Sequence, residues 1–311
     1  MAILGTTSLD VFPLCFGGNV FGWTVDQDAA FEILDAYAAA GGNFIDTADM
    51  YNSWLPDHSI GESEIIIGNW MKARGNRNQM IIATKIGSLP SRKGLAGSNI
   101  PLATQDSLDR LQTEYVDVLY AHRDDLDIPM LETMTAFDAL VQSGKVRYLG
   151  ASNFTAERLQ ESLDVSAANG LAAHSLIQNN YNLMFREEYE NGARVVAAKA
   201  GIAHAPYYGL ASGFLTGKYR PGITVDSPRA RGAAKMLDER GLAVLAAMDA
   251  VAAAHEVPLA AIALAWLYAQ PTIGAPIASA RTVDQLNELL PMATLKLTSA
   301  ELDSLTKSSE L

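Results

Sequence analysis

Hydrophobic residues along the chain follow two patterns, short continuous runs and longer segments with a helical period. In the longer segments apolar residues recur three or four positions apart, as at Phe31, Leu34 and Tyr37, which places them on one face of a helix. The same spacing recurs in Leu131, Met134, Phe137 and Leu140 and in Leu242, Leu245, Met248 and Val251. The short runs do not alternate cleanly, which is typical of buried parallel strands. The candidate strands are 13–17, 43–46, 80–84, 116–121, 146–150, 175–178, 201–205 and 272–275.

A strand followed by a helix, repeated about eight times, indicates parallel strands joined by helical crossovers. An open dinucleotide-binding sheet carries G-x-G-x-x-G after its first strand, whereas this chain has FGGNV at 16–20. The pattern therefore favours a closed (β/α)8 TIM barrel of the α/β class. No linker or low-complexity run divides residues 1–311, so we expect a single domain. Two irregular stretches, 86–100 and 216–238, are expected over the functional mouth of the barrel.

Composition and charge narrow the classes of partner. Acidic residues outnumber basic residues 35 to 23, for a net charge of −12, which disfavours nucleic acids and anionic membrane surfaces. Cys15 is the single cysteine, so neither an internal disulfide nor a multi-cysteine metal site is available. The histidines show no H-x-H or H-E-x-x-H spacing, which argues against a metal-dependent barrel hydrolase. The first residues lack a signal-peptide pattern, and we expect a cytoplasmic protein.

Polar residues at the ends of the candidate strands supply the candidate chemistry. Asp46 closes one run, Tyr51 follows it, and Lys85 and His122 end the next two. In a parallel barrel these strand ends meet at one mouth. A lysine lowers the pKa of a nearby phenol, an aspartate neutralises the buried lysine, and a histidine orients a carbonyl. Each residue alone is open to a plain structural role, but together they suit general acid catalysis on a carbonyl oxygen, with hydride from a cofactor.

Several motifs then resemble those of the aldo-keto reductase family, in the family's order and over nearly the whole chain. They are GGNFIDTADMY at 41–51, GESEIIIGNW at 61–70, IIATK ending at Lys85, SLDRLQTEYVDVLYAHRDD at 107–125, GKVRYLGASNF at 144–154, IQNNYNL at 177–183, YYGLASGFLTGKYR at 207–220 and ARTVDQL at 280–286. The chain is most similar to the branch that holds bacterial members and potassium-channel β-subunits. The resemblance implies a reductase that binds NADPH across the barrel mouth and passes hydride to an aldehyde or ketone. Tyr51 would protonate the oxygen, helped by Lys85 and Asp46, with His122 orienting the substrate.

The resemblance also implies a set of cofactor-binding residues. Ser152, Asn153 and Gln178 match partners of the nicotinamide carboxamide, and Tyr207 matches the aromatic residue that stacks on the nicotinamide ring. The residues that match the pyrophosphate loop are Leu210, Gly213, Leu215, Gly217 and Lys218, and those that match the adenosine end are Ser279, Arg281, Gln285 and Glu288. Plain alternatives are a helix cap for Asn153 and a surface cation for Arg281.

Three positions depart from the family pattern. Tyr208 and Gly209 stand where many relatives have Ser-Pro, Ala278-Ser279 replaces Pro-Gly, and Leu289 replaces an adenine-binding Asn. These changes remove a serine hydroxyl from the phosphate site and leave NADH open as a second cofactor. Arg281 still suits the 2′-phosphate of NADPH, because a guanidinium pairs well with phosphate.

The substrate itself is less clearly indicated. Trp23 follows the first strand and Trp54 follows the Tyr51 loop, where aromatic residues would line a pocket for a small carbonyl compound or alcohol; packing between loops is the alternative for both. Two other functions remain open at this point. One is an NAD(P)+-dependent dehydrogenase of sugars, polyols or other alcohols, and the other is a non-catalytic nicotinamide-binding redox sensor.

Overall fold

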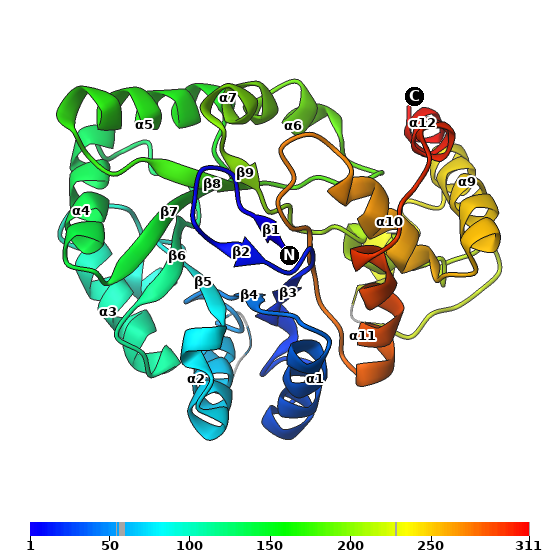
Figure 1. The fold of residues 1–311 in the computed structure, drawn as a ribbon, viewed down its shortest axis with the longest axis horizontal. Coiled ribbons are helices and arrows are strands. Elements are labelled where there is room, and N and C mark those ends of the chain that lie inside the picture. The colour runs from blue at the N-terminus through cyan, green and yellow to red at the C-terminus, as the bar shows by residue number, and fades with distance from the viewer. Residues whose placement is uncertain (54, 56–59, 228, 311) are drawn as a thin grey trace.

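The computed structural model describes residues 1–53, 55, 60–227 and 229–310. At its centre is an eight-stranded parallel sheet in the order β10-β3-β4-β5-β6-β7-β8-β9 (Figure 1). The strands are β3 (Cys15–Gly17), β4 (Phe44–Asp46), β5 (Ile81–Ile86), β6 (Val116–Ala121), β7 (Val146–Ser152), β8 (His174–Gln178), β9 (Ala203–His204) and β10 (Ile277–Ala278). Backbone hydrogen bonds from His204 N to Thr272 O (2.7 Å) and from Ile277 N to Pro206 O (2.9 Å) join the two ends of this order. The sheet therefore closes, and the predicted (β/α)8 barrel is confirmed.

Helices follow the strands and surround the barrel (Figure 1). They are α1 (Gln27–Ala39), α2 (Glu62–Arg74), α3 (Ile100–Leu111), α4 (Met130–Gln142), α5 (Ala156–Asn169), α6 (Glu187–Glu190), α7 (Ala193–Ala200), α8 (Ala230–Ala234), α9 (Glu239–His255), α10 (Leu259–Tyr268), α11 (Val283–Leu289) and α12 (Ser299–Ser308). Across the described residues no single helix has the length and hydropathy to cross a membrane. The pair α9 and α10 meets those criteria only jointly, across a bend of 98°.

The helical period identified most of the buried helix faces, with two exceptions. Leu131 and Leu242, which the pattern places inside, are 47% and 36% exposed. In α4 the buried stripe runs through Met130, Met134 and Phe137, at spacings of four and three residues. Leu131 is rotated about 100° from Met130 and therefore faces outward.

The last strand lies later in the chain than the apolar pattern predicts, at Ile277–Ala278 rather than 272–275. Thr272 has φ +72°, a left-handed conformation that interrupts an extended strand. Ile273 makes only an isolated bridge to His204. The sequence therefore predicted correctly that an eighth strand exists but misplaced it along the chain.

A small N-terminal hairpin closes the lower end of the barrel. Its strands β1 (Ala2–Ile3) and β2 (Asp10–Val11) pair antiparallel, and Figure 1 shows them across the centre of the barrel. Leu4, Leu9 and Val11 join the interior cluster that also contains residues of β4, β5, β6 and β8. Two-residue strands carry too short a pattern to be predicted from sequence. The open mouth is therefore at the other end, where the barrel strands finish.

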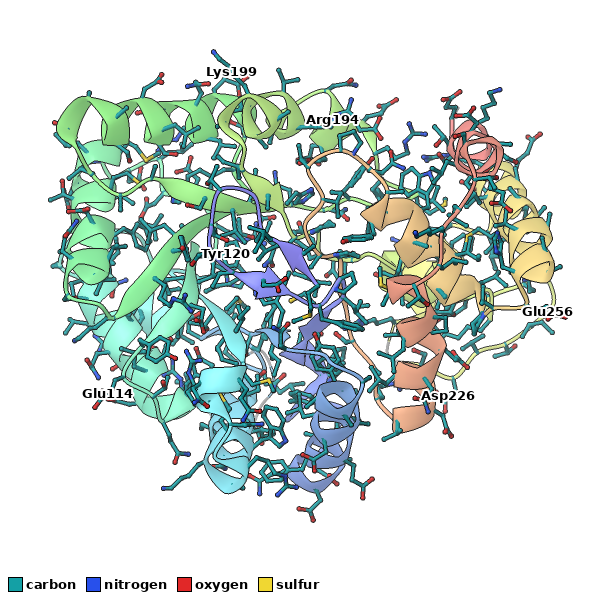
Figure 2. All side chains as sticks on the ribbon, in the orientation of Figure 1. Glu114, Tyr120, Arg194, Lys199, Asp226 and Glu256 are labelled. Carbon is teal, nitrogen blue, oxygen red and sulfur yellow. The ribbon has the colours of Figure 1, made fainter. Side chains whose placement is uncertain are left out.

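Packing inside the barrel leaves no room for extra atoms. Tyr120 is fully buried near the barrel centre, whereas charged residues such as Glu114, Lys199 and Glu256 lie at the periphery (Figure 2). A Cβ on Gly150, the neighbour of Tyr120 in β7, would lie 2.3 Å from the tyrosine ring. Glycine at this position therefore lets the large ring fill the interior.

Candidate active site

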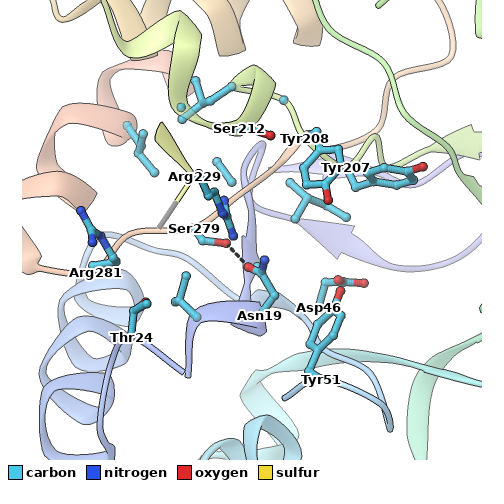
Figure 3. Close-up of a pocket in the computed structure, with 18 of the residues that line it drawn as sticks. Asn19, Thr24, Asp46, Tyr51, Tyr207, Tyr208, Ser212, Arg229, Ser279 and Arg281 are labelled. Carbon is cyan, nitrogen blue, oxygen red and sulfur yellow. Dashed lines mark hydrogen bonds between the residues drawn. The ribbon is translucent and has the colours of Figure 1, made fainter. Parts of the chain in front are cut away.

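A cavity of about 930 Å³ lies at the C-terminal ends of the barrel strands (Figure 3), within the usual size of ligand sites. Asp46, Ser152 and Gln178 are the final residues of β4, β7 and β8. The predicted site residues that line the cavity are Trp23, Asp46, Tyr51, Lys85, His122, Ser152, Asn153, Gln178, Tyr207, Leu210, Gly213, Gly217, Lys218, Ser279, Arg281, Gln285 and Glu288. The four residues predicted from strand ends and most of those implied by the family motifs thus line one cavity.

Two predicted residues are not among these lining residues. The side chain of Leu215 is fully buried in the hydrophobic core and does not line the cavity. It follows the strained turn at Ser212 and Gly213 and points into the protein, which the motif alone does not reveal. Trp54 lies outside the described residues. The stretch 86–100, expected over the mouth, contributes none of the described lining residues.

A buried ion pair forms the floor of the cavity. Lys85 Nζ lies 2.6 Å from Asp46 Oδ2 and donates a second hydrogen bond to Thr47 O, also 2.6 Å away. Gln178 Nε2 donates to the other carboxylate oxygen of Asp46 at 2.8 Å. Burial opposes the charge on Lys85, but attraction to Asp46 and Tyr51 outweighs it and raises the lysine pKa above its usual value. The ammonium is thus held charged in a dry place.

Tyr51 stands over this ion pair. Lys85 Nζ lies 4.9 Å from the centre of the Tyr51 ring, and the His122 ring lies edge-on at 6.3 Å between centroids. Burial raises the pKa of Tyr51 to about 12, although the charge of Lys85 acts in the opposite direction. Lys85 does act to lower the pKa of Tyr51, as the sequence predicted. The prediction that the pKa falls overall was wrong, because burial has the larger effect. The phenol is protonated at neutral pH.

His122 follows β6 and is neutral in this setting. Burial, together with the charges of Lys85 and Arg123, lowers its pKa to about 3. Its buried Nδ1 has no hydrogen-bond partner among the described residues. A neutral imidazole beside a phenol can hold a carbonyl or hydroxyl oxygen without introducing charge.

Next to these residues lies a hydrogen-bonded polar group from three strand ends. Tyr207 OH donates to Asn153 Oδ1 at 2.7 Å, and Asn153 Nδ2 donates to His122 O at 2.9 Å. Ser152 Oγ donates to Gln178 O at 2.8 Å. Asn153 adopts φ +59°, a conformation that asparagine tolerates better than most residues. The network orients amide groups and one aromatic ring toward the cavity.

Cations gather at the far end of the cavity. Lys218, Arg229 and Arg281 all line it. Burial lowers the pKa of Lys218, and so do the charges of Arg281 and Arg229; burial likewise lowers the pKa of Arg229. Positive charges that destabilise one another in this way form a site for an anion. The Arg229 guanidinium also lies 5.6 Å from the Trp23 ring centre.

Close contacts shape the part of the cavity between these two ends. Ser279 Oγ donates to Asn19 Oδ1 at 2.7 Å (Figure 3). A Cβ on Gly17 would lie 2.7 Å from Ser279 Oγ, so a side chain there would displace the serine. Gln285 Oε1 accepts a hydrogen bond from Arg281 N at 2.9 Å and fixes the backbone that carries Arg281.

Several lining residues were not predicted. They are Asn19, Thr24, Met50, Arg123, Tyr208, Ser212, Ser227 and Arg229, among others. Arg229 lies in the irregular stretch 216–238, which was assigned to the mouth and in which Gly217 and Lys218, but not Arg229, were named. Arg123 directly follows His122, and this adjacency was the available signal. Among the described residues, no three His, Cys, Asp or Glu side chains are grouped to hold a metal ion.

A closed parallel barrel with a buried Tyr–Lys–Asp–His group beside a cation-lined cleft defines an α/β-barrel oxidoreductase. A family model described as the aldo/keto reductase family matches residues 13–310. The chain belongs to the aldo-keto reductase family. It is accordingly an NAD(P)H-dependent oxidoreductase that acts on carbonyl or alcohol groups.

Individual relatives have diverse names. The chain is 33% identical to the aldo-keto reductase ausK of Emericella nidulans, over 96% of this chain and 79% of the relative. It is 32% identical to an aryl-alcohol dehydrogenase of Pestalotiopsis microspora, over 97% and 80%. It is 33% identical to a probable voltage-gated potassium channel subunit beta of Arabidopsis thaliana, over 92% and 88%.

Proposed function

We propose that this protein reduces aldehydes or ketones with NADPH and that Tyr51 donates the proton to the carbonyl oxygen. The proposal is carried by one observation. A protonated phenol stands over a buried lysine–aspartate pair, at the end of the cavity that also holds the Asn153, Gln178 and Tyr207 group. The substrate is a small molecule, and the strongly acidic chain does not suit nucleic acid or anionic membrane.

The residues of this chain divide the proton chemistry between them. Because the pKa of Tyr51 is raised to about 12, the phenol carries its proton at neutral pH and can donate it to an oxygen that gains negative charge. The phenolate left behind is stabilised by the Lys85 ammonium, which Asp46 and Thr47 O keep in place. Neutral His122 holds the substrate oxygen near Tyr51.

The cavity suits a phosphorylated dinucleotide. Asn153, Gln178 and Tyr207 would hold the carboxamide and ring of the nicotinamide at the Tyr51 end. Lys218, Arg229 and Arg281 would hold phosphate groups. Burial and then mutual repulsion lower the pKa values of Lys218 and Arg229, and a bound anion would relieve the repulsion. When bound, the nicotinamide supplies the hydride. The three cations favour NADPH, with its additional phosphate, over NADH.

The test is a screen of NADPH oxidation over aldehydes, ketones and sugars, repeated in reverse with alcohols and NADP+. Tyr51→Phe removes only the acidic hydroxyl. We expect this variant to keep the fold and the NADPH dissociation constant, measured by fluorescence titration, and to lose about 10²- to 10⁴-fold in kcat. Near-normal turnover in Tyr51→Phe would sink the mechanism.

Alcohol oxidation is the second candidate function. The same residues perform it with Tyr51 as the base, and one relative is named an aryl-alcohol dehydrogenase. The high pKa of Tyr51 keeps the phenol protonated at neutral pH, so alcohol oxidation should gain rate as the pH rises, whereas carbonyl reduction should not. A higher kcat/KM for alcohols than for carbonyl compounds at pH 7 would favour the dehydrogenase instead.

A further inference from the structure

Tyr208 has an uncommon backbone conformation. Its φ is +56°, in the left-handed region that bulky residues rarely adopt. Two hydrogen bonds to its carbonyl oxygen hold this conformation, from Asn182 Nδ2 at 2.9 Å and from Ala211 N at 2.7 Å. Asn182 is itself fully buried. A strained residue held by its surroundings is a sign of function when it lines a cavity, and Tyr208 does so.

The held backbone presents the ring of Tyr208 to the cavity. The ring lies edge-on to Tyr207, with 5.0 Å between centroids and 76° between planes. Figure 3 shows Tyr208 and Tyr51 on opposite sides of the cavity, with their hydroxyl groups directed toward the same space. A charge on Tyr208 would raise the pKa of Tyr51, which places the two phenols within electrostatic reach.

The ring is also incompletely covered. Tyr208 is 50% exposed, although a tyrosine ring gains free energy when its faces are buried. Tyr207 packs edge-on against the ring, and the hydroxyl of Tyr208 points into the cavity opposite Tyr51 (Figure 3). Met50 and Trp23 add apolar surface to the lining of the same cavity, which also contains the charged residues Arg123 and Arg229.

Building on the carbonyl reduction proposed above, we propose that Tyr208 determines substrate specificity by packing against the ring of an aromatic aldehyde or ketone. An aromatic substrate would cover the exposed ring while its carbonyl oxygen lies at Tyr51. Contact between two aromatic rings is worth about three- to tenfold in affinity beyond the area that it buries. A saturated ring of the same size would lack that gain.

The test compares benzaldehyde with cyclohexanecarbaldehyde, which are similar in size and differ in aromaticity. The measured quantity is the ratio of their kcat/KM values, taken from NADPH consumption in wild type and variants. Differences in intrinsic reactivity cancel when ratios are compared between enzymes. Tyr208→Gly removes the ring and suits the left-handed backbone, Tyr208→Leu keeps apolar bulk, and Tyr208→Phe keeps the ring. Phe185→Ser is the matched control, since Phe185 is 47% exposed and does not line the cavity.

We expect Tyr208→Gly and Tyr208→Leu to lower the benzaldehyde preference about three- to tenfold. Tyr208→Phe and Phe185→Ser should keep the preference, and the NADPH dissociation constant should change less than twofold in all four. An unchanged ratio in Tyr208→Gly and Tyr208→Leu overturns the proposal. So does an equal loss for both aldehydes with weaker NADPH binding, which would make Tyr208 a cofactor ligand. If wild type reduces no carbonyl compound, the proposed reductase function fails first, and the specificity proposal fails with it.

Discussion

Asp46→Asn should destabilise the protein through the charge that it leaves behind on Lys85. In wild type the two side chains are 2–3% exposed and 2.6 Å apart. Attraction to Asp46 is the main influence that raises the pKa of Lys85 against burial. Without it, burial acts largely unopposed and the pKa of Lys85 falls below its usual value. An asparagine whose amide group faces the ammonium cannot replace the carboxylate.

The size of the effect follows from the alternative open to the lysine. Instead of staying charged and buried, Lys85 can fold as the neutral amine, which at pH 7 costs about 4 to 5 kcal/mol relative to an ordinary lysine. The cost of neutralising Lys85 is therefore an upper limit on the stability lost in Asp46→Asn. It agrees with the measured cost of breaking buried ion pairs, about 3 to 5 kcal/mol. The unfolded chain binds the proton and the folded variant does not. Stability of the variant should therefore rise, relative to wild type, by about 1.4 kcal/mol per pH unit.

Urea unfolding followed by tryptophan fluorescence, at pH 7, 8 and 9, measures this difference. Wild type should show no such pH dependence from Lys85, because its raised pKa keeps the proton in both states below about pH 10. The double variant Asp46→Asn/Lys85→Met removes both charges and should recover at least half of the stability, without activity. If the difference in the free energy of unfolding between wild type and Asp46→Asn stays constant from pH 7 to pH 9, the reasoning is refuted.

Three further results are expected. Arg281→Ala should weaken NADPH binding about tenfold and NADH binding far less, and equal loss for the two cofactors in fluorescence titrations would reject its phosphate role. Asp49 is buried, and burial followed by the charge of Glu64 raises its pKa to about 8. The folded state therefore holds a proton that the unfolded chain releases above about pH 4, so Asp49→Asn should stabilise the protein by about 2 to 4 kcal/mol at pH 7 and hardly at pH 4; an equal gain at both pH values contradicts this. Tyr208→Gly and Tyr208→Ala both lose the half-buried ring, but glycine adopts φ +56° without strain, so Tyr208→Gly should be the more stable of the two by about 1 kcal/mol; equal free energies of unfolding would count against strain at this position.

The barrel was predictable because its strands and helices have different hydrophobic periods. Asp46, Lys85 and His122 were found because each ends or follows an apolar run, and parallel strands bring such ends together. The hairpin of β1 and β2 was missed because its strands have two residues each. The hydrophobic pattern also misplaced the last strand, because the positive φ at Thr272 cannot be predicted from the hydropathy of the residues around it.

The parts of the site that escaped prediction depend on three-dimensional packing. Arg229 and Tyr208 lie in irregular segments, where no period relates a residue to the cavity. Leu215 lies in a family motif, but its side chain packs in the hydrophobic core. The net pKa of Tyr51 depends on how deeply the ring is buried, and a sequence names the charged neighbours of a group but not its exposure to water.

The hairpin also bears on how Tyr51, the proposed proton donor, regains its proton between turnovers. Leu4, Leu9 and Val11 fill the lower end of the barrel, and Lys85 and Asp46 are almost completely buried above them. Among the described residues, the open route for water to Tyr51 is the cavity at the opposite end of the barrel. On the mechanism proposed above, each proton that Tyr51 gives away would be replaced through the same opening, after the bound molecules have left. The proposed mechanism therefore makes proton resupply and product release consecutive events in this fold.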